Sequence, residues 1–67
     1  MSQKRLGTVL RRLRKAKDLT QMALAKKAKV GRTYLVKLER GAKQNPSLAI
    51  LKRLAKALGV PVTELLE

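Results

Sequence analysis

The chain has 67 residues, which fits one domain over residues 1–67, and a domain of this size buries only about 60% of the surface of its unfolded chain. It has no cysteine, no histidine and only four scattered acidic residues, so disulfides, metal sites, bound cofactors and enzyme activity are not expected. Seventeen lysines and arginines give a net charge of +13, a balance typical of proteins that bind nucleic acid.

The apolar residues are too interrupted for a membrane span. No apolar run approaches the ~18–20 residues that cross a bilayer, and the N-terminus MSQKRLGTVL lacks the apolar centre of a signal peptide. We therefore expect a soluble, cytoplasmic, nucleoid-associated protein of a prokaryote or phage, with no membrane partner.

A first helix is predicted near the N-terminus and should end near Lys17, where Asp18 breaks the apolar pattern. Its apolar residues follow the i, i+3, i+4, i+7 spacing of one helix face: Leu6, Val9, Leu10 and Leu13. Gly7 lies inside this helix and costs about 1 kcal/mol relative to alanine, so we expect the first turn to fray.

A second helix is predicted over about 20–28, with Thr20 as its N-cap. Its buried side is expected to consist of Met22, Leu24, Ala25 and Ala28. Ala25 is small enough for two helices to cross closely at that point. The turn that follows runs from Lys29 to Gly31, and Gly31 can cap the next helix without a side-chain oxygen.

The third helix is predicted over about 32–40 and ends at Gly41, a glycine of the kind that often follows a helix. At about 100° per residue, Leu35 and Leu38 share its inner side, and Tyr34 lies on the border. The outer side carries Arg32, Thr33, Val36, Lys37 and Arg40.

Two more helices complete the prediction. Ser47 should cap a fourth helix that ends at Gly59, and Pro61 is placed to begin a short fifth one. Their apolar residues are Leu48, Ile50, Leu51, Leu54, Ala55 and Leu58, followed by Val62, Leu65 and Leu66. The expected fold is all-α, a compact arrangement of five helices around one Leu/Ala/Val core.

The outer side of the third helix has the chemistry to contact base edges in the major groove of double-stranded DNA. An arginine bonds guanine O6 and N7 with two hydrogen bonds, so Arg32 is the strongest candidate, and Lys37 could also reach guanine. Thr33 can bond a base edge or touch a thymine methyl group, and Val36 can only touch the methyl. The alternative for the basic residues, including Arg40, is an ordinary solvated helix face.

Other polar residues are candidates for phosphate contacts. Gln21 begins the second helix, where free N–H groups favour an anion, or it is an ordinary exposed residue. The connection Lys43, Gln44 and Asn45 offers further donors, or is simply a polar turn. Tyr34 could donate its hydroxyl to a phosphate or pack at the helix edge.

Glu39 is the one acid between Asp18 and Glu64. An outward carboxylate on a helix bound for DNA would repel phosphates, so we expect Glu39 to turn inward and pair with Arg14. The alternative is a surface pair with a lysine, worth less than about 1 kcal/mol.

Nearly the whole chain resembles the Xre/Cro family of phage-repressor-type helix-turn-helix domains. The matching segments are LTQMALAKKA at 19–28, VGRTYLVKLERG at 30–41, NPSL at 45–48 and LAKALGVPVTELL at 54–66. The resemblance implies a five-helix fold with a recognition helix at 32–40 and a homodimer on a two-fold symmetric operator.

The resemblance also implies roles for single residues. Gln21 would contact phosphate and brace the recognition helix, residues 43–45 would hold the DNA backbone, and Arg14 and Glu39 would form a buried pair. The base-facing residues would be Arg32, Thr33, Val36 and Lys37.

Three residues depart from the family pattern. Lys29 stands where glycine is usual, so a left-handed backbone there would be strained. Gly31 replaces a Ser or Thr cap, and Val36 replaces a frequent serine, which shifts the expected contacts toward thymine methyl groups.

The leading hypothesis is a sequence-specific DNA-binding transcription regulator, most simply a repressor. One alternative is a controller protein of a restriction system or the antitoxin of a toxin–antitoxin pair, whose toxin or other protein partner would bind Val62, Leu65 and Leu66. A second alternative is a non-specific, nucleoid-type DNA binder.

Overall fold

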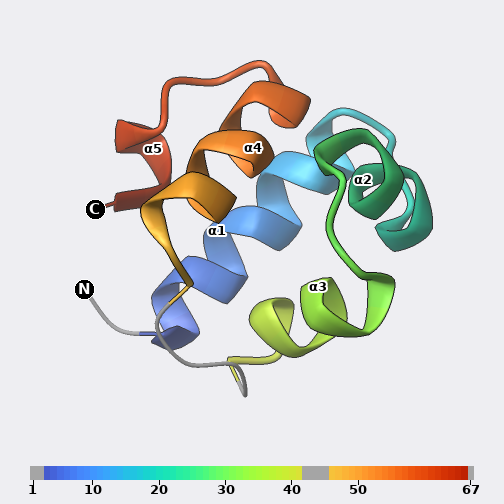
Figure 1. Ribbon diagram of the computed structural model, residues 1–67, viewed down its shortest axis with the longest axis horizontal. Coiled ribbons are helices and arrows are strands. Elements are labelled where there is room, and N and C mark those ends of the chain that lie inside the picture. The colour runs from blue at the N-terminus through green and yellow to red at the C-terminus, as the bar shows by residue number, and fades with distance from the viewer. Residues whose placement is uncertain (1–2, 42–45, 67) are drawn as a thin grey trace.

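A computed structural model describes residues 3–41 and 46–66. Within these ranges the chain forms five α-helices and no strand, which confirms the expected all-α fold (Figure 1). The helices are α1 (Gln3–Ala16), α2 (Gln21–Ala28), α3 (Arg32–Glu39), α4 (Leu48–Leu58) and α5 (Thr63–Leu66).

The helix ends follow from local side-chain chemistry. Thr20 Oγ1 accepts a hydrogen bond from Ala23 N at 3.0 Å, and Ser47 Oγ accepts one from Ile50 N at 3.1 Å. Each cap contributes about 1 kcal/mol and confirms the predicted start of α2 or α4. Gly59 ends α4, again as predicted, and adopts the left-handed conformation.

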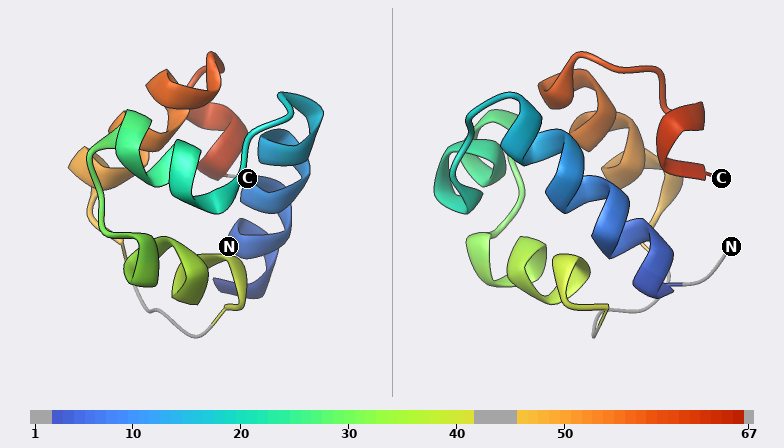
Figure 2. Two further views of the ribbon diagram at one scale, coloured as in Figure 1. Left: turned by 90° about the vertical axis from the view of Figure 1, so that its right-hand side faces the viewer. Right: turned by 180° about the vertical axis from the view of Figure 1, so that it is seen from behind.

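The core is built almost entirely from leucine and alanine. Helix α1 packs against α3 and α5, and α2 packs against α3 and α4, so every helix contributes to one cluster (Figures 1 and 2). The fully buried large side chains are Leu10, Leu24, Leu35, Leu38, Leu54, Leu58 and Leu65.

Three large apolar residues are exposed. Met22 is 51% exposed because it lies off the stripe that Leu24, Ala25 and Ala28 form on α2, so its predicted burial is wrong. Leu48 is 52% exposed in the first turn of α4, and Leu66 is 42% exposed as the last residue of α5.

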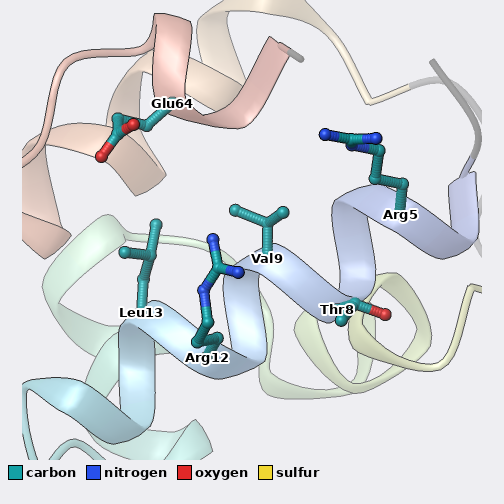
Figure 3. Close-up of a pocket in the computed structure, with 6 residues that line it drawn as sticks. All are labelled: Arg5, Thr8, Val9, Arg12, Leu13 and Glu64. Atoms are coloured by element: carbon teal, nitrogen blue, oxygen red, sulfur yellow. The ribbon is translucent and has the colours of Figure 1, made fainter.

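The short helix α5 leaves a hollow of about 250 Å³ against α1. Val9, Arg12 and Leu13 point from α1 toward the segment that carries Glu64 (Figure 3). Across the described residues we find no helix long and apolar enough to cross a membrane, and no group of three metal-ligating side chains.

Candidate nucleic-acid interface

The turn between α2 and α3 sets the angle between these helices. Lys29 adopts the left-handed conformation, with φ 59° and ψ 45°, where an L-residue other than glycine is strained. Val30 N donates to Ala25 O at 2.9 Å and Lys29 N to Lys26 O at 3.2 Å, which closes the end of α2. Gly31 then precedes α3 as its N-cap, without a side-chain hydrogen bond, as predicted. A lysine therefore occupies the strained position for which glycine is suited.

Helix α3 has an apolar inner side and a polar outer side. Leu35 and Leu38 are buried in the core, and Tyr34 is partly buried and packs against it. The packing role of Tyr34 is confirmed, whereas its contact with phosphate stays a prediction. Val36 is half-buried, and the exposed residues of the outer side are Arg32, Thr33, Lys37 and Arg40. Figure 2 shows α3 at one edge of the molecule, where a groove of DNA can reach it.

A buried ion pair holds the C-terminal end of α3. Arg14 Nε donates to Glu39 Oε2 at 2.7 Å, and Arg14 Nη2 donates to Glu39 Oε1 at 3.0 Å. The two side chains are only 10% and 3% exposed. The expected inward pairing of Glu39 with Arg14 is confirmed, and its two parallel bonds fix the orientation of both groups.

The ion pair also connects α1 and α3 to the start of α2. Gln21 Nε2 donates to Glu39 Oε1 at 3.1 Å, and Arg14 Nη1 donates to the carbonyl oxygen of Leu19 at 2.8 Å. Gln21 therefore braces the third helix, as the family resemblance implied. Its second predicted role, a contact with phosphate, stays a prediction.

Gly7 explains how α3 can lie so close to α1. A Cβ atom at this position would lie 2.5 Å from the carbonyl oxygen of Leu38 and 2.6 Å from that of Glu39. Both atoms belong to the backbone at the end of α3, so they cannot turn aside. The pattern within the first helix indicated only a local cost for Gly7, because the other residues of this contact lie far along the chain.

A hollow of about 320 Å³ opens where α1, α2 and α3 meet. The exposed cations Arg11 and Arg40 line it, next to Gln21 and the buried ion pair. Arg40 was predicted to face DNA, but Arg11 was not. Arg11 lies three residues before Arg14, which places the two arginines on neighbouring positions of the α1 surface. This spacing was the feature of the sequence from which the position of Arg11 could have been predicted. Lys43, Gln44 and Asn45 lie outside the described residues, so their predicted contacts stay predictions.

The chain is similar in sequence to known helix-turn-helix proteins. The family model described as Helix-turn-helix matches residues 10–65. The immunity repressor protein of Bacillus phage phi105 is 43% identical over 87% of this chain and 40% of its own length. The control protein C.MunI of a Mycoplasma species is 40% identical over 91% of this chain and 82% of its own length. The chain thus spans less than half of the phage repressor and most of the control protein.

Solved structures agree with these sequence matches. The restriction-modification controller protein C.AhdI from Aeromonas hydrophila superposes with a TM-score of 0.90 at 40% identity, over 94% of each chain. SinR, the master regulator for biofilm formation, in complex with DNA, superposes with a TM-score of 0.89 at 35% identity, over 92% of this chain and 98% of that one.

Proposed function

Because this chain belongs to the helix-turn-helix family, we propose that it regulates transcription by binding a specific sequence of double-stranded DNA, most simply as a repressor. One observation carries the proposal: α3 presents a basic, exposed outer side, while the buried pair of Arg14 and Glu39 holds its C-terminal end in place. The proposed action is binding, without a catalytic step, at the nucleoid DNA of a prokaryote or at the DNA of a phage.

The outer side of α3 enters the major groove in this proposal. Arg32, at the first position of α3, projects toward the groove floor and bonds guanine O6 and N7, and Lys37 reaches a second guanine. Thr33 contacts a base edge or a thymine methyl group, and Val36 a thymine methyl group.

Phosphate contacts on both sides of α3 fix its register on the duplex. Gln21 offers its amide at the N-terminus of α2, where free N–H groups favour an anion. Arg40 and Arg11 lie at the mouth of the neighbouring hollow and extend the contact along one strand. The loop of residues 43–45 is proposed to hold the other strand.

We infer that two copies bind together on a two-fold symmetric operator, with half-sites about 34 Å apart. Leu66 is exposed and Val62 is half-buried, so both can contribute to an interface between copies. Leu65 was predicted to join this surface, but it is 1% exposed and belongs to the core. The apolar surface for a second copy or a toxin is therefore smaller than predicted.

Selection of bound DNA from a random library tests the proposal. At about 150 mM salt, where non-specific binding is weak, we expect one enriched, roughly palindromic site. In the purified complex, Arg32→Ala should lose ~1–3 kcal/mol of binding free energy, confined to one base position in each half-site. A library with no enriched sequence, or a small equal loss on every sequence, would favour the non-specific nucleoid-type alternative.

The controller protein of a restriction–modification system is the second candidate. The match covers 94% of the C.AhdI chain and 82% of C.MunI, so this chain spans most of the length of both. Under this candidate the selected site lies upstream of restriction and methyltransferase genes. The antitoxin alternative predicts instead that a second chain copurifies with this one.

A further inference from the structure

A second group of cations surrounds the ends of α2 and α4. Two adjoining hollows of about 450 and 250 Å³ lie there, and Lys27, Lys56 and Ala57 line both of them. We call the five cations that line them the basic face: Lys17, Lys27, Lys29, Arg53 and Lys56.

The basic face lies away from the recognition helix. In Figure 1 and in both views of Figure 2, α3 lies at the lower edge of the molecule, whereas α1 and α4 end near the upper edge. The domain measures 25 × 23 × 20 Å, comparable to the width of a DNA duplex. Lys29 belongs to the turn that leads into α3, but a straight duplex held against α3 leaves the cations at the ends of α1 and α4 uncovered.

Favourable interactions with helix dipoles explain the positions of only some of these five cations. Lys27 and Lys56 lie in the last turns of α2 and α4, where a cation is favourable. Arg53 lies in the middle of α4, beyond the reach of this effect, which falls off within the last turn. No acidic residue is among the described residues that line the two hollows, so the five cations repel one another until an anion screens them.

The composition of the basic face favours phosphate as its ligand. Four of its five cations are lysines, which are depleted at the centres of protein–protein interfaces but commonly contact the DNA backbone. The apolar residues that line the two hollows are Leu19, Ala28, Ala57 and Leu58, and all but Leu19 are buried in the core, so they offer little apolar surface to a protein partner. Among the described residues of the lining, none is an aromatic residue on which an unpaired base could stack.

We propose that the basic face binds the phosphate backbone of a second double-stranded DNA segment, independently of its sequence. One molecule then bridges two segments, one on α3 and one on the basic face. The α3 half of this bridge rests on the function proposed above, whereas the basic face is an additional site.

A capture experiment tests the bridge. A short mixed-sequence duplex is immobilised, the full chain is added, and retention of a second, fluorescent mixed-sequence duplex is measured. The test variant is Lys27→Gln with Lys56→Gln. The matched control is Arg12→Gln with Lys15→Gln, which removes the same charge from exposed positions of α1 outside both hollows. Arg53→Gln serves as an independent second variant, and thermal unfolding confirms that each variant is folded.

The wild-type chain should retain the second duplex at about 50 mM salt, where phosphate contacts contribute strongly. The test variant should retain it at least about 10-fold less well and lower the salt slope by about 1.8, as expected for two lost phosphate contacts. Arg53→Gln should give a smaller loss in the same direction, and the control should stay close to the wild type. Affinity for one selected duplex should change equally in the test variant and the control.

Two outcomes would overturn the basic face as a DNA site. One is a wild-type chain that retains no second duplex. The other is equal retention by the test variant and the control, which would assign bridging to the recognition helices of two associated copies. Neither outcome affects the proposed function, which fails separately if no sequence is enriched in the selection.

Discussion

The two ends of α3 are held in opposite ways. At the C-terminal end, Glu39 is buried against Arg14, and Gly7 allows the backbone to contact α1 directly. At the N-terminal end, Gly31 provides no side-chain cap, and Arg32 is exposed. The helix is thus fixed mainly through the end that lies farthest from its strongest base-contacting candidate. Stability and DNA contact therefore depend on largely different residues.

Removing the carboxylate at the fixed end should have the largest effect. Glu39→Ala leaves the guanidinium of Arg14 buried without its counter-charge, a loss that costs about 3–5 kcal/mol of unfolding free energy. Urea unfolding measures this loss. Glu64→Ala, which removes an exposed acid, should change stability by no more than about 0.5 kcal/mol. Similar losses in the two variants would show that the buried pair does not hold the C-terminal end of α3.

A methyl group at the contact between α1 and α3 should have the next largest effect. Alanine raises helix propensity, but in Gly7→Ala the new Cβ meets the Leu38 carbonyl oxygen at 2.5 Å, so we expect a net loss of about 1–3 kcal/mol. The matched control is Gly31→Ala, whose Cβ would lie 3.9 Å from Tyr34 Cβ, an ordinary contact. Thermal unfolding should show the control within about 0.5 kcal/mol of wild type. A Gly7→Ala variant more stable than wild type would show that α3 moves aside easily.

The turn before α3 should give the smallest effect, with the opposite sign. Lys29→Gly relieves the left-handed backbone and should be about 1 kcal/mol more stable than Lys29→Ala, which keeps the strain. Comparing these two variants cancels the loss of the lysine charge, which they share. If their melting temperatures coincide, the turn carries no strain at Lys29.

Local chemistry predicted much of this fold correctly. Thr20 and Ser47 were recognised as caps because an N-cap needs only a side-chain oxygen and a free N–H within a few residues. The inward turn of Glu39 followed from its charge, since a carboxylate on the outer side of α3 would face phosphates. The left-handed Lys29 followed from the family pattern, which has glycine at that position.

The predictions failed where the deciding atoms are distant in sequence. Gly7 lowers the helix propensity of α1, which is a local effect. Its benefit is that the α3 backbone can lie close to α1, and no pattern within α1 indicates that contact. Met22 was predicted on the buried side of α2, but the position of the neighbouring helices decides which part of α2 is covered. Leu65 and Leu66 are adjacent and equally apolar, yet one is buried and the other exposed because α5 packs through only one side.

The anchoring of α3 has a consequence for how such a protein diversifies. Its fixed positions are Leu35, Leu38 and Glu39, together with the glycine of α1, and none of them belongs to the proposed base-contacting set. Exposed positions such as Arg32 and Thr33 can therefore be exchanged with little change in stability. Descendants of one gene can acquire new target sites by a few substitutions on an unchanged scaffold, and a designer can redirect the domain in the same way.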